Sequence, residues 1–206
     1  MSELPSAPLH HDQRLDYCKQ LRQQIRHARR ALTPAQQQAA AQAASQRLLA
    51  LIDSLPAIRH VALYFSCDGE LDTAPLFPAL WQRGIATCLP VLHPFSQGQL
   101  LFLQYHRDSH MQPNRFGIAE PKLNINALVL PHMLDLIVAP LVAFDDAGNR
   151  MGMGGGFYDR TLANPALKAL AVGYAHDCQY RPQLPLAPWD IPLPVITTPT
   201  RLIDNR

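Results

Sequence analysis

The sequence predicts one α/β domain with a mainly parallel, mixed sheet and helices on both of its faces. Short, almost continuously apolar runs alternate with segments of helical periodicity, which is typical of strands buried on both sides. The 206 residues suffice for one domain with a sizeable core, and neither a repeat nor a low-complexity linker divides them. We assign residues 13–206 to this domain and residues 1–12, which lack periodicity, to a flexible N-terminal arm.

Two helices are predicted first. Apolar residues recur at steps of three and four, as on one face of a helix, at Leu15, Cys18, Leu21, Ile25, Ala28 and Leu32. Another face carries the cations Lys19, Arg22, Arg26, Arg29 and Arg30. Such a stripe either meets solvent or presents charge to a polyanion. Thr33, Pro34 and Gln36 then form a helix start with a capping box, and this second helix should run to about Leu51.

Strands and a helix alternate in the next part of the chain. Residues 60–66, 74–84 and 85–92 read as strand, helix and strand, a β-α-β unit in which Gly84 ends the helix. Further strands are predicted within residues 99–106, 134–144 and 167–175, and near Val195 and Ile196. The proline-rich stretch 182–199 should otherwise form extended loops.

Composition excludes several classes of protein. A net charge of +2 gives no overall attraction to nucleic acid or to an anionic membrane. No run approaches the roughly 18 apolar residues of a membrane helix, and the N-terminus lacks the apolar region of a secretory signal, so we expect a cytoplasmic protein. The cysteines Cys18, Cys67, Cys88 and Cys178 form no C-x-x-C pair, which predicts reduced, structural thiols.

Glycine is concentrated in one place. Five of the ten glycines fall between Gly148 and Gly156, after the predicted strand that ends near Pro140. Unobstructed N–H groups ahead of a helix that begins near Phe157 would form an anion-binding concavity suited to phosphate, although a flexible hairpin or lid has the same composition. Walker A and G-x-G-x-x-G do not match. Ligands bind beyond the carboxyl ends of strands in such sheets, so this segment and the loop 66–73 are the candidate site.

Three charged neighbours favour the phosphate interpretation. Arg150 and Arg160 flank the glycines and can hold phosphate oxygens with two hydrogen bonds each. Asp159 follows on the first turn of the predicted helix. Its carboxylate either holds Mg²⁺ or is an ordinary charge at a helix start.

Four segments together resemble a known family. They are "ALTPAQ" (31–36), "FSCDGELDT" (65–73), "FGIAEP" (116–121) and "VAFDDAGNRMGMGGGFYDR" (142–160). In this order they are similar to the 5-formyltetrahydrofolate cyclo-ligases, also called methenyltetrahydrofolate synthetases, and the resemblance covers the chain from about Asp16 to Pro199. It implies a fold like that of the NagB/RpiA/CoA transferase group.

The resemblance implies an ATP- and Mg²⁺-dependent ligase of one-carbon metabolism. Such an enzyme converts 5-formyltetrahydrofolate to 5,10-methenyltetrahydrofolate and releases ADP and phosphate. The formyl oxygen is phosphorylated, and N10 then closes the ring. Phosphoryl transfer asks the protein mainly for positioning and charge neutralisation, which glycines, arginines and a carboxylate supply. We expect a monomer that binds the folate, with or without further glutamates, and neither membrane nor nucleic acid.

The resemblance also assigns site residues. Arg150 and Asp159 would act in catalysis, and Asp159 and Asp190 would hold the metal. ATP would contact Lys19, Arg22, Arg150, Met151, Gly152, Met153, Gly154, Gly155, Gly156, Phe157 and Tyr158. The folate would contact Phe65, Glu70, Met153, Gly154, Gly155, Gly156 and Phe157. A carboxylate such as Glu70 can accept from the N–H donors of the pterin's aminopyrimidine edge, and Phe65 can pack on the ring.

The cations depart from the family pattern. In the family, a Lys and an Arg one turn apart reach the ATP phosphates. Arg22 takes the Arg position, but the residue four before it is Cys18, with Lys19 beside it. Many members also have a basic residue at the position of Met153 or Gly155. Because both are neutral here, Arg150, Arg22 and Mg²⁺ should carry more of the charge compensation.

Other interpretations stay open at this point. Glu70 or, better, Asp72 could cap the following helix, and Asp190 could be a turn residue. The chain could be a nucleic-acid- or anion-binding module that uses the basic helix, or a sugar-phosphate isomerase or CoA-transferase-like enzyme of similar architecture. A requirement for ATP separates the ligase from the other two enzymes, and a steep loss of RNA binding with added salt would identify the binding module.

Overall fold

The computed structural model describes residues 11–206, so residues 1–10 of the expected arm lie outside the described residues. The helices are α1 (His11–Arg30), α2 (Pro34–Ser54), α3 (Leu76–Gln82) and α4 (Phe157–Leu162), with 3-10 turns η1 (Ile125–Ala127), η2 (Pro131–Met133) and η3 (Asp177–Gln179). The strands are β1 (His60–Ala62), β2 (Ala86–Leu92), β3 (Leu100–Tyr105), β4 (Met111–Pro113), β5 (Ala119–Pro121), β6 (Leu128–Val129), β7 (Leu136–Ala139), β8 (Ala143–Phe144), β9 (Arg150–Met151), β10 (Leu170–Tyr174), β11 (Val195–Thr197) and β12 (Leu202–Asp204).

Both predicted N-terminal helices form. α1 already begins at His11, so residues 11 and 12 belong to the helix and not to an arm. The capping box of α2 is confirmed, because Thr33 Oγ1 accepts from the Gln36 N–H at 3.2 Å and Gln36 Oε1 accepts from the Thr33 N–H at 2.8 Å. α2 continues past the predicted end to Ser54.

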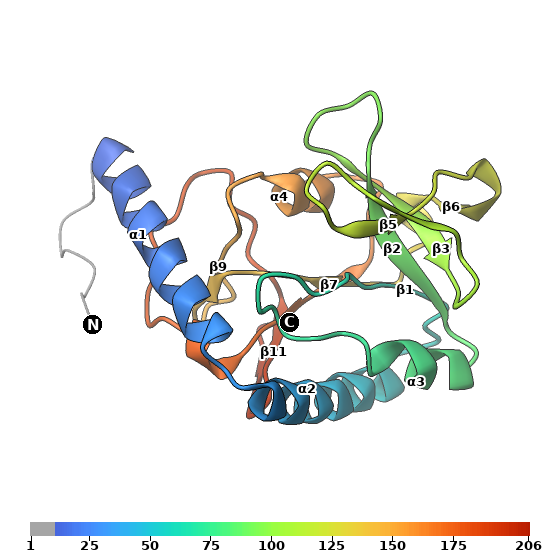
Figure 1. Cartoon of the computed structure of the whole chain (residues 1–206), viewed down its shortest axis with the longest axis horizontal. Coiled ribbons are helices and arrows are strands. Elements are labelled where there is room, and N and C mark those ends of the chain that lie inside the picture. Colours follow the sequence, from blue (N-terminus) through green and yellow to red (C-terminus); the bar gives the residue numbers. More distant parts are fainter. Residues whose placement is uncertain (1–10) are drawn as a thin grey trace.

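The central sheet is mixed and mainly parallel, as predicted. Its strand order is β12-β11-β10-β7-β1-β2-β3-β6. The strands β11, β10, β7, β1 and β2 are parallel neighbours, whereas the pairings β12–β11, β3–β2 and β6–β3 are antiparallel. The predicted β-α-β unit is β1-α3-β2 (Figure 1).

Two predicted strands are shorter or more divided than expected. Residues 60–66 give only β1, because the chain turns into the loop 66–73, where the Thr73 hydroxyl donates to the Tyr64 carbonyl. Residues 134–144 divide into β7 and β8. Pro140, which has no N–H for a sheet hydrogen bond, separates them, and β8 pairs with β9 in a hairpin of its own.

Helices cover both faces of the sheet, as predicted. Successive side chains of a strand point to opposite faces. Val61 and Val138 therefore pack in the cluster that contains α2 and α3, while Ala62 and Ala139 pack on the side of Tyr158 from α4. Figure 1 shows α2 and α3 below the sheet and α4 above it.

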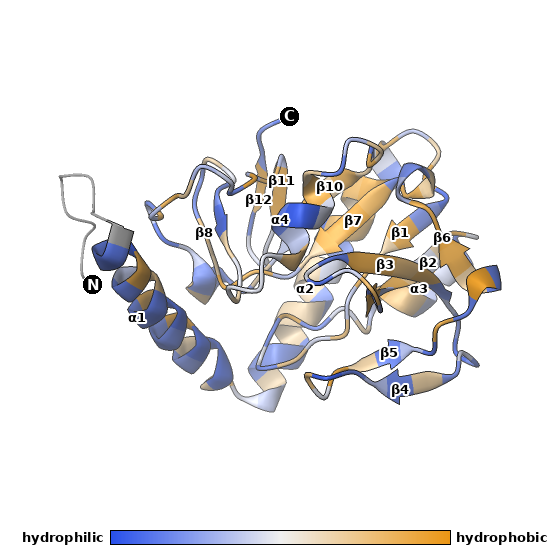
Figure 2. Cartoon of the chain, turned by 90° about the horizontal axis from the view of Figure 1, so that it is seen from above, coloured by the Kyte–Doolittle hydropathy of each residue, from blue (hydrophilic) through white to orange (hydrophobic). Residues whose placement is uncertain are grey.

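Helix α1 stands apart from the sheet. Its apolar residues Cys18, Leu21 and Ile25 pack against the β8–β9 hairpin and Leu184. Figure 2 shows a largely hydrophilic α1 beside the apolar strands of the body. The helix thus docks on the hairpin that leads into the glycine-rich segment. Within residues 11–206, no helix combines the length and apolar character needed to cross a membrane.

Candidate active site

The two predicted loops lie at the same end of the sheet. Loop 66–73 follows β1, and the glycine segment, residues 152–156, follows the parallel neighbour β7 through the β8–β9 hairpin. Tyr158 links them electrostatically, because its pKa is raised by burial and by the charge of Glu70 and lowered by Arg150. The structure therefore brings together Glu70, Tyr158 and Arg150, which the sequence placed in one site.

Asp68 is the charged centre of loop 66–73. Its carboxylate binds Arg26 Nε at 2.6 Å, Arg29 Nη2 at 2.8 Å, and Arg30. Burial would raise the pKa of Asp68, but hydrogen bonds from the three arginines outweigh it and hold the pKa at about 2. The basic stripe of α1 is thus largely engaged within the protein. Its interpretation as a solvated or polyanion-binding face is wrong for Arg29, whose side chain is fully buried.

Glu70 is an acceptor in the same loop, and its side chain is 9 % exposed. Its Oε2 accepts from the Cys67 N–H at 3.1 Å, and its Oε1 lies 3.8 Å from Arg29 Nη2. Burial raises the pKa of Glu70, while the Cys67 N–H and the Arg29 charge oppose the rise. Asp72 Oδ1 accepts from the Ala74 N–H at 3.0 Å, a turn contact ahead of α3. The capping role considered from the sequence is wrong for both acids, because α3 begins after Pro75 and has no side-chain cap.

Phe65 lies half-buried next to this acceptor loop. Its ring centroid is 5.7 Å from that of Phe77 and 5.4 Å from that of Tyr105. The ring is therefore held on one side by an aromatic cluster. Such support fixes an apolar surface on which a flat ligand can pack.

The glycine segment is a turn between β9 and α4, and α4 begins at Phe157 as predicted. Gly154 and Gly156 have φ angles of 98° and 65°, a region that other residues rarely adopt. A Cβ at Gly155 would stand 2.9 Å from the Phe157 ring. At Gly152 it would make only ordinary van der Waals contact. The turn itself requires three of these glycines, in addition to any demand from a ligand.

Arg150 and Asp159, the predicted catalytic pair, contact each other. Arg150 Nη2 donates to Asp159 Oδ1 at 2.6 Å, and the two side chains are 2 % and 23 % exposed. Arg150 Nε is buried and has no hydrogen-bond partner within the described residues. A buried donor without a partner costs about 1–3 kcal/mol. Arg150 therefore has donor capacity that Asp159 does not use.

Two other arginines hold the glycine segment from outside. Arg22 Nε donates to the Gly152 carbonyl at 2.8 Å. Arg160 donates through Nη2 to the Gly155 carbonyl and through Nε to the Gly98 carbonyl, the latter at 2.7 Å. Arg160 therefore binds backbone carbonyls in this structure. The sequence had indicated a phosphate contact for it instead. Arg160 links the glycine segment to the loop between β2 and β3.

The other predicted ATP contacts differ in exposure. Lys19 is exposed on α1, next to the buried Cys18, and Met153 is 50 % exposed. Met151 is buried among the apolar side chains that join α1 to the β8–β9 hairpin. A ligand could therefore contact the backbone of Met151 without loss of packing, but not its side chain.

The predicted metal ligands lie in different surroundings. Asp190 Oδ2 accepts from the Ala187 N–H at 2.8 Å, which is the turn role considered from the sequence. It lies near α1, because its charge adds to the burial that raises the pKa of Cys18. Among residues 11–206, no group of three or more His, Cys, Asp or Glu side chains is arranged to hold a metal ion. Mg²⁺ often takes one or two carboxylates plus substrate phosphates, so Asp159 fits a metal that binds with a nucleotide.

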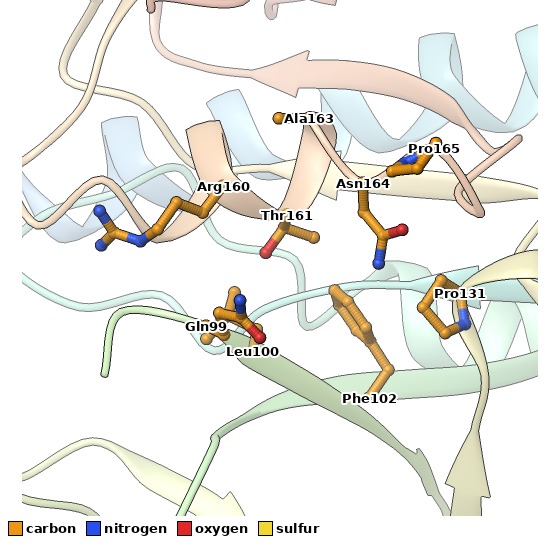
Figure 3. Close-up of a pocket in the computed structure, with 9 residues that line it drawn as sticks. All are labelled: Gln99, Leu100, Phe102, Pro131, Arg160, Thr161, Ala163, Asn164 and Pro165. Carbon is orange, nitrogen blue, oxygen red and sulfur yellow. The ribbon is translucent and has the colours of Figure 1, made fainter. Parts of the chain in front are cut away.

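Two hollows border α4. The larger, about 490 Å³, is lined by Phe157, by residues of the 92–99 and 112–115 stretches, and by Glu120. The smaller, about 260 Å³, lies between β3 and the end of α4, away from the glycines. Figure 3 shows Asn164 directed toward Phe102 in this hollow, whereas Arg160 points away. The larger hollow is of the size that small ligands occupy.

Sequence reasoning missed two buried residues of the site. Arg29 follows Ile25 by one turn and continues the buried face of α1, so helical spacing could have located it. His176 follows β10 and is 2 % exposed, with no partner for Nε2 within the described residues. Burial and the Arg29 charge lower the pKa of His176 to about 4, against hydrogen bonding to the backbone of loop 66–73. No sequence signal sets His176 apart from the other histidines.

Known proteins are similar to this chain in sequence and in fold. The model of the 5-formyltetrahydrofolate cyclo-ligase family matches residues 16–199. The chain is 52 % identical over 179 residues to the 5-formyltetrahydrofolate cyclo-ligase of Escherichia coli (strain K12), which covers 86 % of this chain and 98 % of that protein. Identity to the Haemophilus influenzae 5-formyltetrahydrofolate cyclo-ligase is 49 %, over 85 % and 94 % of the two chains.

Two solved structures are also similar. The NMR structure of Aquifex aeolicus 5,10-methenyltetrahydrofolate synthetase has a TM-score of 0.74 and 32 % identity, over 92 % of this chain and 93 % of that one. A 5,10-methenyltetrahydrofolate synthetase from Mycoplasma pneumoniae has a TM-score of 0.72 and 26 % identity, over 88 % and 98 %. With the agreement of motif, sequence and fold, the chain belongs to the 5-formyltetrahydrofolate cyclo-ligase family.

Proposed function

We propose that this protein converts 5-formyltetrahydrofolate to 5,10-methenyltetrahydrofolate with ATP, releasing ADP and phosphate. One observation carries the proposal: loop 66–73, with the Glu70 carboxylate, and the glycine segment, next to the Arg150 guanidinium, follow parallel neighbouring strands at the same end of the sheet. An acceptor suited to a pterin and a cationic glycine turn suited to a triphosphate thus share one site. Transfer between two substrates requires that proximity. The names of the similar proteins support the same reaction.

The proposed reaction needs no nucleophile from the protein. The formyl oxygen attacks the γ-phosphorus as the bond to the β,γ-bridging oxygen breaks, which gives ADP and an imidoyl phosphate. N10 then bonds to the formyl carbon and loses its proton to solvent. The bond from that carbon to the phosphate oxygen breaks, which releases inorganic phosphate and leaves the methenyl product. The protein aligns the two substrates and compensates the negative charge of the phosphates.

Each loop has its own task in this proposal. Glu70 accepts from the N–H donors of the pterin, and Phe65 supports the ring. Phe157 borders both the glycines and the 490 Å³ hollow, which offers space for the rest of the folate. The glycine N–H groups, Arg150, Arg22 and Lys19 bind the triphosphate.

We further propose that Mg²⁺ accompanies ATP and that Asp159 is its main protein ligand. The metal would neutralise charge on the phosphates. Binding would separate Asp159 from Arg150 and direct the unused donors of Arg150 to the nucleotide. Asp190, which caps a turn beside α1, is the weaker candidate for a second ligand.

The direct test is an absorbance assay. Purified protein is mixed with 5-formyltetrahydrofolate, ATP and Mg²⁺, and formation of the methenyl product is followed in the near ultraviolet. We expect product only when ATP is present, and chelation of Mg²⁺ should abolish it. Folded protein that forms no product would overturn the proposed function. Product without ATP would point instead to an enzyme of another class.

A further inference from the structure

Arg29 joins three separate parts of the molecule from within. Its side chain is fully buried. Nε donates to the Asp68 carbonyl at 2.8 Å, Nη2 to Asp68 Oδ2 at 2.8 Å, and Nη1 to the Leu141 carbonyl at 3.3 Å. The guanidinium thus connects α1, loop 66–73 and the segment that follows β7. A planar fork with fixed donors is suited to such a junction, whereas an ammonium group is not.

The same guanidinium faces Glu70. Nη2 lies 3.8 Å from Glu70 Oε1, while Oε2 accepts from the Cys67 N–H. Arg29 therefore acts on loop 66–73 at two residues. It hydrogen-bonds Asp68 directly and attracts the Glu70 carboxylate by its charge. The other charged or titratable groups that face Glu70 are Cys67, Asp68, Tyr64, Tyr158 and His176. Arg29 supplies a fully buried positive charge to this group of side chains.

We propose that Arg29 is a positioning residue for the folate: it holds loop 66–73 so that the Glu70 carboxylate stands ready to accept from the pterin. This inference rests on the proposed function. Arg29 acts through Glu70 and does not itself touch substrate. Without it, the carboxylates of Asp68 and Glu70 would share a buried region with no buried cation between them, and like charges there repel.

The nucleotide side of α1 does not depend on Arg29. Arg22, which contacts the Gly152 carbonyl, lies next to Leu21, and Leu21 and Ile25 pack with Met151 on the β8–β9 hairpin. Apolar packing therefore holds that part of the helix by itself. Loss of Arg29 should disturb loop 66–73 and leave the contact of Arg22 in place.

The experiment compares Arg29→Met with Arg30→Met. Both remove a guanidinium from Asp68, but the Arg30 side chain is 53 % exposed, whereas that of Arg29 is fully buried. We expect Arg29→Met to raise the KM for 5-formyltetrahydrofolate by about tenfold or more, with the KM for ATP changed less than about twofold. Arg30→Met should change neither. If the substitution only unfolded part of the protein, the concentration of active enzyme would fall. That would lower the apparent kcat and leave both KM values unchanged.

A double-mutant cycle tests whether Arg29 acts through Glu70. In a Glu70→Gln background, Arg29→Met should raise the folate KM by no more than about twofold. A full tenfold effect in that background overturns the inference, as do equal rises in both KM values or an unchanged folate KM. If Arg29→Met yields no soluble protein, Arg29→Lys takes its place. It keeps the charge but cannot make all three hydrogen bonds, so a rise in the folate KM is still required.

A pH profile adds a readout that a merely structural residue would not move. An opposite charge at this distance lowers a carboxyl pKa, so Arg29→Met should shift the acid limb of kcat/KM for the folate upward by about one pH unit. An unshifted limb overturns the inference. If Glu70→Gln alone leaves the folate KM unchanged, Glu70 is no folate contact and the inference falls with it. If product fails to form in the wild type, the proposed function itself has failed.

Discussion

Loop 66–73 and the glycine segment border the same site but are held in different ways. Loop 66–73 is fixed by side chains within the protein: Asp68 by three arginines, Glu70 by the Cys67 N–H, and Thr73 by the Tyr64 carbonyl. The glycine segment has an exposed turn, and the arginines Arg22 and Arg160 reach its carbonyls from neighbouring elements. The first is fixed by contacts within the protein, while the second has an exposed turn.

This difference predicts where damage will show. Changes around loop 66–73 disturb buried charges, so they should lower the free energy of unfolding in a pH-dependent way. Changes around the glycine segment mostly disturb an exposed turn, so they should lower activity more than they lower stability.

His176 should make the protein sensitive to mild acid. Its pKa is lowered to about 4 by burial and by Arg29, so the folded protein holds it neutral while the unfolded chain protonates it near pH 6.5. The free energy of unfolding is therefore unaffected by His176 above pH 6.5. It decreases as the pH falls, by about 3 kcal/mol at pH 4, because the unfolded chain binds the proton more tightly. Urea unfolding from pH 7 to 4 measures the slope, which His176→Gln should reduce. Exposed His106→Gln is the control, and an equal slope in wild type and His176→Gln would contradict the assignment.

Asp68→Asn should destabilise the protein at neutral pH. The pKa of Asp68 is depressed to about 2, so its contribution is present above pH 4 and disappears as pH falls toward 2. The expected loss at pH 7 is about 2 kcal/mol. Asp53→Asn removes an exposed ion pair with Arg83 and should leave the unfolding midpoint in place. Equal effects of the two substitutions would show that loop 66–73 gains nothing from its arginines.

Arg150→Ala should lower turnover by about tenfold or more, equivalent to about 1.4 kcal/mol in the barrier. The variant removes a cation from the proposed phosphate site and leaves Asp159 without its partner. Steady-state rates, with circular dichroism to confirm folding, measure the effect. Near wild-type turnover in a folded variant would remove Arg150 from the machinery. Arg150→Lys should rescue only part, because it lacks the bidentate fork.

Arg160→Ala should have the smallest effect, a rise in the KM for ATP of about threefold, since two backbone carbonyls lose a donor at an exposed turn. Arg83→Ala, just after the C-terminal end of α3, is the matched control. Gly98→Ala offers a second route, because a Cβ there would overlap the Arg160 guanidinium. If Arg160 holds the segment, Gly98→Ala and Arg160→Ala should not add.

The parts of the fold that depend on local chemistry could be predicted from the sequence. The α2 capping box is written in Thr33, Pro34 and Gln36, and the parallel β-α-β unit in its apolar runs. The length of β1 could not, because the chain leaves the sheet where Thr73 reaches back to Tyr64. Such a contact has no periodicity.

The candidate site is predicted more readily from the sequence than the contacts of its residues are. Glycine spacing and flanking charges placed it at residues 150–160, but three glycines are needed by the turn itself. Arg160 was expected at phosphate and instead binds Gly98, 62 positions away in the chain. Arg29 was expected in a basic stripe and is buried against Leu141. Contacts between distant segments decide these roles, and no local pattern encodes them.

The position of α1 also has a consequence for folding in time. Arg29 finds the Leu141 carbonyl 112 residues later, and Arg22 finds the Gly152 carbonyl 130 residues later. At a synthesis rate of about 5–20 residues per second, α1 waits roughly ten seconds for its partners to leave the ribosome. Its apolar face and its cations are uncovered throughout that wait. The nascent chain should therefore be most exposed to aggregation and to chaperones before the β8–β9 hairpin emerges, and the active site should be among the last parts of the protein to form.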